Sequence, residues 1–586
     1  MRVPATDRPK MDPRWVVKPA PGREARALAG ETGLSTLTAA CLIHRGVDTA
    51  DAARRFLRPG LQDLHDPGTL PGVPEAAARI RSALRAGEKI LVCGDYDADG
   101  ITGTAILVNF LRLLGADTEY FIPRRAVEGY GLSGDALNAA ADRGVRLVIS
   151  VDCGITAFKE ARIARERGMD LVITDHHEPA RELPEAFALI NAKLPGSPYP
   201  FREISGSGTA FKLAWGAAQA YSNAPRVTGP FREFLLEAMA LAGLGTIADV
   251  VPLTGENRTF AAFGLRALAR SGRPGITALR RAARIDGKTL DAKQVAFRMA
   301  PRLNALGRLG DATAAVELFT TDSADRADAI AADLETSNRR RQEIEREILA
   351  SARERLDDAP IPWGIVLEDA AWHEGVIGIV ASKLAEEIHR PAVLIAVKGD
   401  TARGSGRSIP GVPLHRVLES CGDVLTRFGG HAQAAGFEIR TRDIPVFRER
   451  FAAAVRDSLG GAPPQPEILA DAEVSLDAIT PEVAAELARL APFGNGNPEP
   501  LFVARAVTIA DGPRPMGAEG RHLEWRLRQG TAFFRAVGFG WGPRYEALAA
   551  VRGPVSIVFQ PSLNEWQGRT QLELILQDLR ATDDVP

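Results

Sequence analysis

Three aspartates stand at alternate positions directly after an apolar run. The segment Cys93-Gly-Asp-Tyr-Asp-Ala-Asp-Gly100 follows Ile90-Leu-Val92 and contains Asp95, Asp97 and Asp99. Carboxylates this close repel one another unless a cation joins them, and hard oxygen ligands suit Mg²⁺ or Mn²⁺. The motif therefore predicts half of a site for divalent cations, although acidic residues are also common in loops that follow strands.

Later apolar runs end in residues of the same kind. These are Asp152 after Leu147-Val-Ile-Ser-Val151, the trio Asp175-His176-His177 after Leu171-Val-Ile-Thr174, and Asp249 within Gly245-Thr-Ile-Ala-Asp-Val-Val-Pro252. The carboxyl ends of parallel strands meet at one edge of a sheet, so these segments would converge in one crevice. Taken singly, Asp152 and Asp249 are also typical of turn residues, and a pair of histidines is also common on a protein surface. Their convergence favours a metal centre.

Length and composition bound the class of protein. At 586 residues, 45% of them hydrophobic and 25% charged, the chain is expected to form three or more globular domains. No apolar stretch reaches the roughly 18 residues of a membrane span, and the start is polar and rich in proline. We therefore expect a cytoplasmic protein without a membrane partner. Four scattered cysteines with no C-x-x-C pair argue against a disulfide framework or a zinc site.

Charge gives a weaker indication of the partner. The formal net charge of −2 does not by itself indicate a nucleic-acid-binding protein, so any basic surface must be local. The basic residues are 62 Arg and only ten Lys, and Arg is suited to bidentate contacts with phosphate. An excess of Arg and Ala is equally typical of GC-rich codons.

The order of predicted elements indicates an α/β protein with several units. Residues 1–320 alternate strand and helix patterns, and short helices at 37–43 and 50–57 are expected to cover the sheet. Residues 321–357 contain one long helix, because the stretch from Ser323 to about Leu356 lacks Gly and Pro. A second α/β unit occupies 358–460. In 461–586, five or six short strands with Gly and Pro turns are typical of a small barrel.

Four further segments carry groups that suit phosphate. Two Gly-rich segments are Arg403-Gly-Ser-Gly-Arg-Ser408 and Gly429-Gly-His431-Ala-Gln-Ala-Ala-Gly-Phe437. Their glycines let the backbone approach a phosphate closely, and their Arg, Ser and His side chains can donate hydrogen bonds to it. A Gly-rich turn with an Arg nearby by chance has the same appearance. Ser205-Gly-Ser-Gly-Thr-Ala-Phe-Lys212 is either an anion site at a helix start or a plain tight turn. Pro301-Arg-Leu-Asn-Ala-Leu-Gly-Arg308 combines donors with a helix break.

The Asp97-Ala-Asp99, Asp152, Asp175-His176-His177 and Asp249 positions resemble the four motifs of the DHH phosphoesterase superfamily. Within it, the length, the Gly-Asp-Tyr-Asp-Ala-Asp-Gly-Ile-Thr-Gly form of the first motif and the later segments resemble the RecJ family of single-strand-specific 5′→3′ DNA exonucleases, over nearly the whole chain. The resemblance implies a DHH parallel-sheet domain and a smaller DHHA1 α/β domain joined by the long helix. It also implies an OB-fold as the C-terminal β-barrel.

The resemblance implies two Mn²⁺ or Mg²⁺ ions and assigns roles at the metal site. Asp97 and Asp152 would hold one ion, while Asp99, Asp152, His176 and Asp249 would hold the other, with Asp152 bridging. His177 would help to bind the scissile phosphate, so that Asp152, His176 and His177 carry the catalysis, and Asp95 would stand behind the ligands. Pyrophosphatase members of the superfamily have His where this chain has Cys93, which disfavours that activity and leaves the first ion with fewer protein ligands.

The same resemblance predicts contacts with the nucleic acid. On the path to the metals these are Arg302, Asn304 and Arg308, and opposite the metals they are Arg403, Ser405, Arg407 and His431. In the barrel, Trp566 in the turn Asn564-Glu-Trp-Gln-Gly568 is expected to touch DNA, together with the candidates Trp525, Phe533 and Arg535. OB-folds bind single strands by stacking bases on aromatic side chains, although each of these aromatic residues suits a barrel core equally well.

The predicted activity is hydrolysis of single-stranded DNA from the 5′ end by a two-metal mechanism, releasing mononucleotides in recombination and repair. Single-strand-binding protein and a helicase are expected partners, and both they and the polarity rest on the resemblance alone. An oligoribonuclease or cyclic-dinucleotide phosphodiesterase is an alternative, against which the long helix and barrel argue. A noncatalytic single-strand-binding scaffold is a further alternative, and it would be marked by missing ligands.

Overall fold

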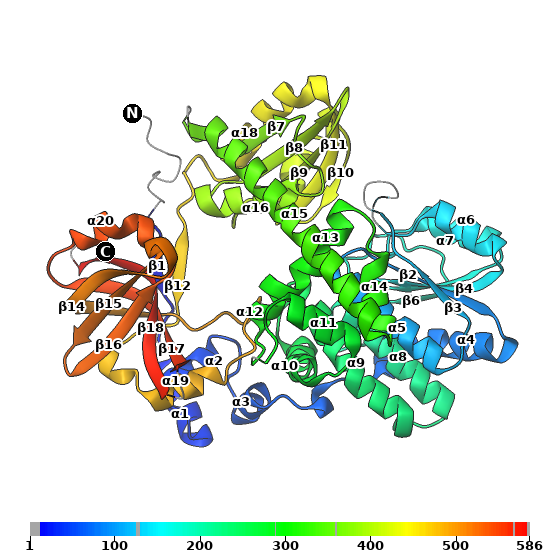
Figure 1. Ribbon diagram of the computed structural model, residues 1–586, viewed down its shortest axis with the longest axis horizontal. Coiled ribbons are helices and arrows are strands. Elements are labelled where there is room, and N and C mark those ends of the chain that lie inside the picture. Colours follow the sequence, from blue (N-terminus) through cyan, green and yellow to red (C-terminus); the bar gives the residue numbers. More distant parts are fainter. Residues whose placement is uncertain are drawn as a thin grey trace.

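The computed structural model describes residues 12–124, 129, 131–287, 289–357, 360–566 and 569–582. Figure 1 shows a large α/β domain, a smaller α/β domain and a barrel, with helix α15 (Ala324–Asp357) running from the first domain to the second. The prediction of one long helix is confirmed. Its 34 residues span roughly 50 Å, so α15 is long enough to hold two domains apart.

The large domain is built on a five-stranded parallel sheet in the order β3-β2-β4-β5-β6. Its strands are β2 (Lys89–Gly94), β3 (Thr118–Phe121), β4 (Val145–Val151), β5 (Asp170–Thr174) and β6 (Ala188–Ile190). The runs that form β2, β4 and β5 are apolar almost throughout because helices cover both faces of the sheet.

Each face of the sheet packs against its own hydrophobic core, and alternate residues of β2 belong to one or the other. Ile90 and Val92 pack with α4 (Val73–Ala86), α5 (Ala98–Leu113) and α8 (Gly206–Ser222), while Leu91 and Cys93 pack with α6 (Gly134–Asp142) and α7 (Phe158–Glu166). The remaining helices of the domain extend the first of these cores. They are α9 (Gly229–Ala248), α10 (Gly255–Arg270), α11 (Pro274–Ala282), α12 (Ala292–Gln294), a π-helical turn (Val295–Met299), α13 (Ala300–Leu309) and α14 (Thr313–Thr320).

The smaller domain has a mixed sheet in the order β10-β11-β9-β8-β7. Its elements are β7 (Ile365–Asp369), α16 (Ile377–Ile388), β8 (Ala392–Lys398), β9 (Thr401–Arg407), α17 (Leu414–Glu419), β10 (Leu425–Gly430), β11 (Ala434–Arg440) and α18 (Ile444–Ser458). Strand β9 pairs antiparallel with β11, which sets Arg407 opposite Ala434. The two Gly-rich segments of the sequence are therefore neighbours.

The C-terminal region is a closed five-stranded barrel. Strands β14 (Phe502–Met516), β15 (His522–Gln529), β16 (Ala532–Gly538), β18 (Arg569–Ala581) and β17 (Val555–Trp566) pair in that order, and β17 pairs back with β14. Strands β12 (Glu467–Ala470) and β13 (Ala472–Glu473) and helices α19 (Pro481–Ala488) and α20 (Tyr545–Ala549) flank it. The predicted barrel is confirmed, with strands longer than the apolar runs alone suggest.

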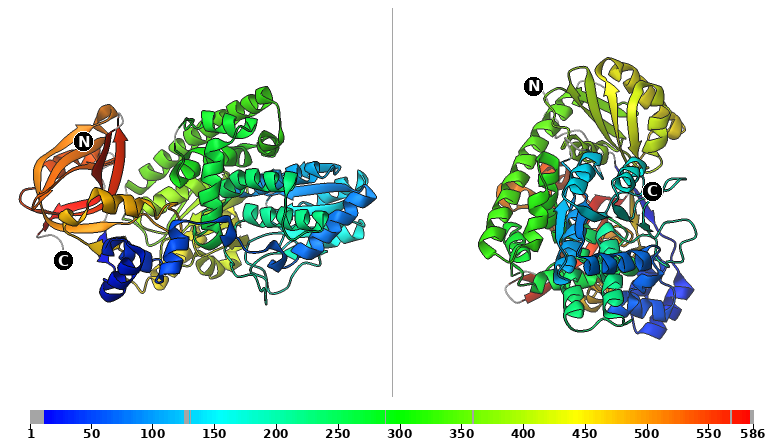
Figure 2. Two further views of the ribbon diagram at one scale, coloured as in Figure 1. Left: turned by 90° about the horizontal axis from the view of Figure 1, so that it is seen from below. Right: turned by 90° about the vertical axis from the view of Figure 1, so that its right-hand side faces the viewer.

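The expectation that the N-terminal helices cover the parallel sheet is wrong. Helices α1 (Gly22–Thr32), α2 (Thr36–Ile43) and α3 (Ala50–Leu57) share a core with α19 and the barrel strands, as Figure 2 shows from below. Strand β1 (Arg14–Val17) pairs parallel with β12. Both faces of the sheet are already covered by α4 and by helices that follow β2 in sequence, whereas the barrel needs apolar cover. The domain boundaries predicted from the sequence remain a prediction.

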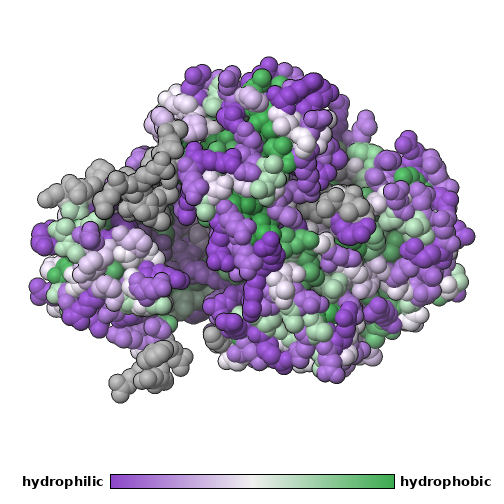
Figure 3. All heavy atoms as spheres, turned by 45° about the horizontal axis from the view of Figure 1, so that its top comes forward, coloured by the Kyte–Doolittle hydropathy of each residue, from purple (hydrophilic) through white to green (hydrophobic). Residues whose placement is uncertain are grey.

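The arrangement leaves a hollow between the barrel and the two α/β domains, and mostly hydrophilic residues border it in Figure 3. Among the described residues, no helix is both long and apolar enough to cross a membrane.

Leu42 tests the placement of the N-terminal helices, because its fully buried side chain belongs to the barrel core. We expect Leu42→Ala to destabilise the protein by about 2 to 5 kcal/mol and to speed hydrogen exchange in β14 to β18, with β2 to β6 unchanged. Leu107→Ala, in the core of the large domain, is the matched control and should show the reverse pattern. Faster exchange in β2 to β6 on truncating Leu42 would contradict the placement.

Candidate functional site

The metal-binding candidates follow the ends of three neighbouring strands. In the register of the sheet, Gly94 at the end of β2 lies opposite Val151 of β4, and Val151 lies opposite Thr174 of β5. The next residue of each strand is therefore an aspartate at the same edge, namely Asp95, Asp152 and Asp175. Asp249 reaches this edge as the residue that ends α9.

The side chains form overlapping groups with the spacing of metal ligands. In each of three trios the ligand atoms lie within 4.8 Å of one another: Asp95, Asp97 and Asp152; Asp99, His176 and Asp249; and Asp152, His176 and His177. The Nε2 atom of His176 is 3.0 Å from Asp152 Oδ1 and 3.5 Å from Asp249 Oδ2. Asp152 and His176 thus link the trios into one site with ligands for two ions.

Electrostatics at the site favour bound cations. Burial and the neighbouring Asp97 raise the pKa of Asp99 to about 6, and burial and Asp99 raise the pKa values of Asp152 and Asp249 well above the usual range. Burial lowers the pKa of His176 to about 3, so its imidazole is neutral and able to bind a metal. Buried carboxylates with one neutral imidazole are a donor set that fits Mn²⁺ or Mg²⁺.

The start of α8 holds Asp99 in place. The backbone N–H groups of Gly206 and Ser207 donate to Asp99 Oδ2 and Oδ1 at 2.6 and 3.0 Å. A Cβ atom on Gly206 would lie 2.5 Å from Asp152 Oδ1, so this position needs glycine. The segment from Ser205, predicted to be either an anion site at a helix start or a plain turn, therefore binds an anion. That anion is the carboxylate of Asp99. Sequence reasoning missed these two donors, although their Ser-Gly-Ser-Gly pattern marked the segment.

Asp97 and Asn304 fix the start of α5. Asp97 Oδ1 accepts from the N–H groups of Asp99 and Gly100 at 2.9 and 3.1 Å, which caps the helix. The Oδ1 atom of Asn304 accepts from the N–H of Ala98 at 2.7 Å. Asn304, predicted as a DNA contact, thus also holds the segment that carries two metal-binding candidates.

Asp175, which the sequence analysis placed at the metal edge without an individual role, orients the second histidine. Its Oδ1 lies 2.7 Å from His177 Nδ1, and its carboxylate also accepts from the N–H groups of His176 and Ile155. Burial alone would lower the pKa of His177, but the bond to Asp175 and that carboxylate's charge raise it overall. Burial alone would raise the pKa of Asp175, and the same bond lowers it overall. The Asp175 carboxylate thus favours the protonated form of His177, the form that suits a phosphate.

A cavity of about 830 Å³ opens on this site from between the two α/β domains. Its lining comes from the start of α5, the end of α9, and from α13, α16 and the β9–β11 region. The residues are Asp97, Ala98, Asp99, Ala248, Asp249, Val250, Asn304, Arg308, Ser382, Ala385, Glu386, Arg407, Ser408, His431, Gln433 and Ala434. Burial and the nearby charge of His177 lower the pKa of His431. Arg308, Arg407 and His431, which the sequence analysis predicts as DNA contacts, thus line the same cavity as three of the metal-binding candidates.

The sequence analysis assigned no individual role to four polar residues of this lining. Ser382 and Glu386 lie one turn apart on α16, Ser408 follows Arg407, and Gln433 lies two residues after His431. The first two could have been found from their i, i+4 spacing, which places both on one face of a helix.

The structure places three other predicted DNA contacts outside the lining of this cavity. Arg302 pairs with Glu335 of α15 at 2.7 Å and so joins two helices. Arg403 pairs with Glu374 and Glu438. The Oγ atom of Ser405 accepts from Arg407 Nη1 at 3.5 Å, which supports the arginine. Ion pairing within the protein explains the first two positions as well as phosphate binding does.

The barrel residues predicted to contact DNA differ in their exposure and in their partners. Trp525 is 2% exposed and packs edge-to-face on Trp541, so it belongs to the core. Arg535 pairs with Glu524 and Glu573. Phe533 is 58% exposed and is available for stacking. The side chain of Trp566 lies outside the described residues.

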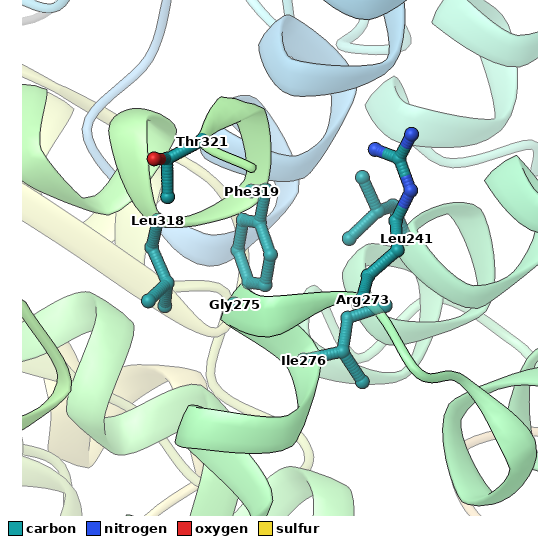
Figure 4. A pocket seen from close by; sticks show the side chains of 7 residues that line it. All are labelled: Leu241, Arg273, Gly275, Ile276, Leu318, Phe319 and Thr321. Atoms are coloured by element: carbon teal, nitrogen blue, oxygen red, sulfur yellow. The ribbon is translucent and has the colours of Figure 1, made fainter. Parts of the chain in front are cut away.

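A second cavity, seen in Figure 4, has no such chemistry. Its volume is about 10 Å³, close to the space that one water needs. Apolar side chains dominate the lining, which consists of Leu241, Arg273, Gly275, Ile276, Leu318, Phe319 and Thr321. It is a packing space within the large domain.

Three protein-family models match the chain. They are the N-terminal domain of the DHH family over residues 89–242, the DHHA1 domain over residues 363–457 and the RecJ OB domain over residues 470–578. The large domain, the smaller domain and the barrel therefore correspond to the three parts that the sequence resemblance implies.

Similar proteins cover nearly the whole length. The single-stranded-DNA-specific exonuclease RecJ of Bacillus subtilis is 37% identical over 97% of this chain and 71% of its own, and that of Escherichia coli is 35% identical over 91% and 94%. The crystal structure of RecJ from Thermus thermophilus in complex with Mn²⁺ has a TM-score of 0.82 at 35% identity, covering 97% of this chain and 79% of that one. The Mg²⁺ complex of the same protein has a TM-score of 0.77 at 34% identity, covering 97% and 78%.

The raised pKa values predict how metal-free protein responds to pH. Because the folded protein holds protons on Asp99 and Asp152 more tightly than the unfolded chain does, these groups stabilise the fold fully below about pH 4. That contribution is lost as the pH rises, through about 6 for Asp99. We expect Asp152→Asn in EDTA to melt a few degrees above the wild type at pH 8, with a smaller difference at pH 5.

Thermal melts with and without Mn²⁺ check this prediction. Mn²⁺ should raise the Tm of the wild type and raise that of Asp152→Asn much less, because bound metal stabilises only the folded state that holds it. Asparagine tolerates the left-handed backbone of position 152, where φ is 63°, so the variant should fold. Equal Tm values in EDTA at every pH, or an equal response to Mn²⁺, would contradict the assignment.

Proposed function

The chain belongs to the RecJ family of single-stranded-DNA-specific exonucleases, and on this premise we propose that it hydrolyses single-stranded DNA from the 5′ end with two divalent cations. The observation that carries the proposal is the site itself. Asp97, Asp99 and Asp249, which belong to the metal-binding trios, line a cavity that Arg407 and His431 also line. Cation ligands on one side and phosphate donors on the other are what hydrolysis of a phosphodiester requires.

The site residues divide by role. Asp95 and Asp97 would hold one cation, Asp99, His176 and Asp249 would hold the other, and Asp152, which lies in two of the trios, would be shared between them. Bound Mn²⁺ or Mg²⁺ neutralises phosphate oxygens, lowers the pKa of water and stabilises the leaving oxygen. Asp95 stands within one of the trios and so contributes as a ligand, where the sequence resemblance placed it behind the ligands.

The other residues bind and orient the substrate. His177, which Asp175 orients and whose pKa it raises, would donate to the scissile phosphate. Arg308 and Arg407 donate to neighbouring phosphates from the two sides of the cavity, and Ser405 steadies Arg407. His431 lines the same cavity and would meet the same strand.

Preference for single strands follows from where the metals lie. Three of their proposed ligands line a cavity between two domains, which a flexible strand can enter and which a stiff duplex would need to widen. The barrel adds a single-strand surface, for which exposed Phe533 is the described candidate. Mononucleotide release and a role in recombination and repair complete the proposal. Single-strand-binding protein, a helicase and a cytoplasmic location remain predictions of the family resemblance.

End-labelled oligonucleotides test the proposal. With Mn²⁺ or Mg²⁺, we expect a 5′-labelled single strand to give labelled mononucleotide at once, while a 3′-labelled copy shortens gradually. Blunt duplex should resist, and Asp152→Ala should lose activity by several orders of magnitude while staying folded, because the bridging carboxylate serves the metals and not the core.

Other outcomes assign other functions. Cleavage of a dinucleotide alone would indicate a small-substrate phosphodiesterase, and binding of strands without cleavage would indicate a scaffold. Immediate release of mononucleotide from the 3′-labelled strand would reverse the proposed polarity. Substantial nuclease activity in pure Asp152→Ala would refute the metal assignment.

Substitutions of Arg407 and Arg302 distinguish a residue that binds substrate from one that supports the fold. We expect Arg407→Ala to raise KM for single strands about tenfold, since a charge-assisted bond to phosphate contributes roughly 1.5 to 3 kcal/mol. Arg302→Ala should leave KM nearly unchanged and lower the Tm, because it leaves Glu335 without its partner on α13. Steady-state kinetics and thermal melts decide, and a large rise in KM on losing Arg302 would return it to the DNA path.

A further inference from the structure

The residue after Asp249 adopts a backbone conformation that its side chain disfavours. Val250 has a φ of 62°, in the left-handed region, where a β-branched residue is a genuine outlier. Its side chain is 63% exposed, so packing of the valine does not impose the conformation. Strain of this kind persists only where the surroundings hold it, and it gathers at functional sites.

A turn at the entry to the barrel holds this segment. The side-chain Nδ2 of Asn495 donates to the carbonyl oxygen of Val250 at 2.7 Å, and the backbone N–H of Leu253 donates to the carbonyl oxygen of Asn495 at 2.8 Å. Cβ atoms on Gly494 and Gly496 would lie 2.8 Å from Leu253 and 2.9 Å from Pro252. One residue, Asn495, thus bonds both ends of the stretch from Val250 to Leu253.

The turn itself is anchored to other elements. The buried side chain of Asn497 donates to the carbonyl oxygens of Leu490 and Pro492 at 2.9 and 2.8 Å, and its Oδ1 accepts from Arg45 of the N-terminal region at 2.8 Å. Arg258 of α10 donates to the carbonyl oxygen of Ala491 at 2.7 Å. With every one of these groups bonded, the turn is rigid enough to impose a conformation on its neighbour.

We propose that Asn495 is a positioning residue for the metal ligand Asp249. Its amide stabilises the left-handed Val250, which fixes the peptide that follows Asp249 and so the end of α9, from which the carboxylate reaches to 3.5 Å from His176 Nε2. Without this bond Val250 relaxes toward an ordinary φ and Asp249 shifts. The inference rests on the proposed function only in taking Asp249 as a metal ligand. It implies that the turn at Gly494–Asn497, which leads into the barrel, supports the metal centre.

Binding of Mn²⁺ in the absence of DNA tests the proposal. The measurement is free Mn²⁺ by electron paramagnetic resonance in titrations of the full chain. We expect Asn495→Ala to weaken Mn²⁺ binding about tenfold, the usual effect of losing a partner that orients a ligand. Lys293→Ala is the matched control, because Lys293 pairs with Glu499 across the same interface without touching residues 250–253, and it should bind Mn²⁺ like the wild type.

Glycine at position 250 distinguishes positioning from general support. Because glycine adopts a φ of 62° without strain, Val250→Gly should keep its Mn²⁺ affinity, and adding Asn495→Ala to it should cost much less than tenfold. If Asn495→Ala does not fold, Asn495→Asp, which replaces the donor by an oxygen of the same shape, takes its place.

The outcomes separate the two levels of inference. Wild-type affinity in Asn495→Ala, or an equal loss in Lys293→Ala, overturns the positioning role while leaving the metal centre intact. A tenfold loss of Mn²⁺ affinity on adding Asn495→Ala to Val250→Gly would also overturn the positioning role. If the wild type itself binds no Mn²⁺, the proposed function fails first.

Discussion

Like charges at the edge of one sheet are the constraint on which the molecule depends. Five aspartates lie in groups whose ligand atoms are less than 5 Å apart, and burial makes their joint ionisation unfavourable without cations. The neighbouring elements restrain these groups one by one. The start of α8 binds Asp99, Asp97 caps α5, and Asp175 holds His177. The fold thus preorganises an arrangement of charge that the chain alone would not keep.

The metal edge was largely predictable from the sequence, because short continuous apolar runs separated by helical stretches are typical of parallel strands, and parallel strands have only one carboxyl edge. The long helix was predictable for a similar local reason, since nothing between Ala324 and Asp357 breaks it. The barrel strands were also marked by their own residues. In each case the signal and the structure it predicts lie within a few residues of one another.

What the sequence did not reveal were choices of partner. The apolar faces of α1 to α3 do not say which core they cover, and they cover the barrel. An arginine such as Arg302 has the same appearance whether it meets phosphate or Glu335. Trp525 fits a core or a stacking surface equally well, and the turn at Asn495 carries no sign of a link to Asp249, which is 246 positions earlier in the sequence. Such contacts depend on tertiary packing, which periodicity does not specify.

The pairing of β1 with β12 bears on how the protein is made. Arg14 and Glu467 meet across 453 positions of sequence, so a ribosome releases one partner long before it makes the other. The large domain has its strands and covering helices in one stretch and can fold as it emerges. Helices α1 to α3 must wait, with apolar faces uncovered, until the barrel strands have been translated. These early helices are therefore among the last elements to reach their place.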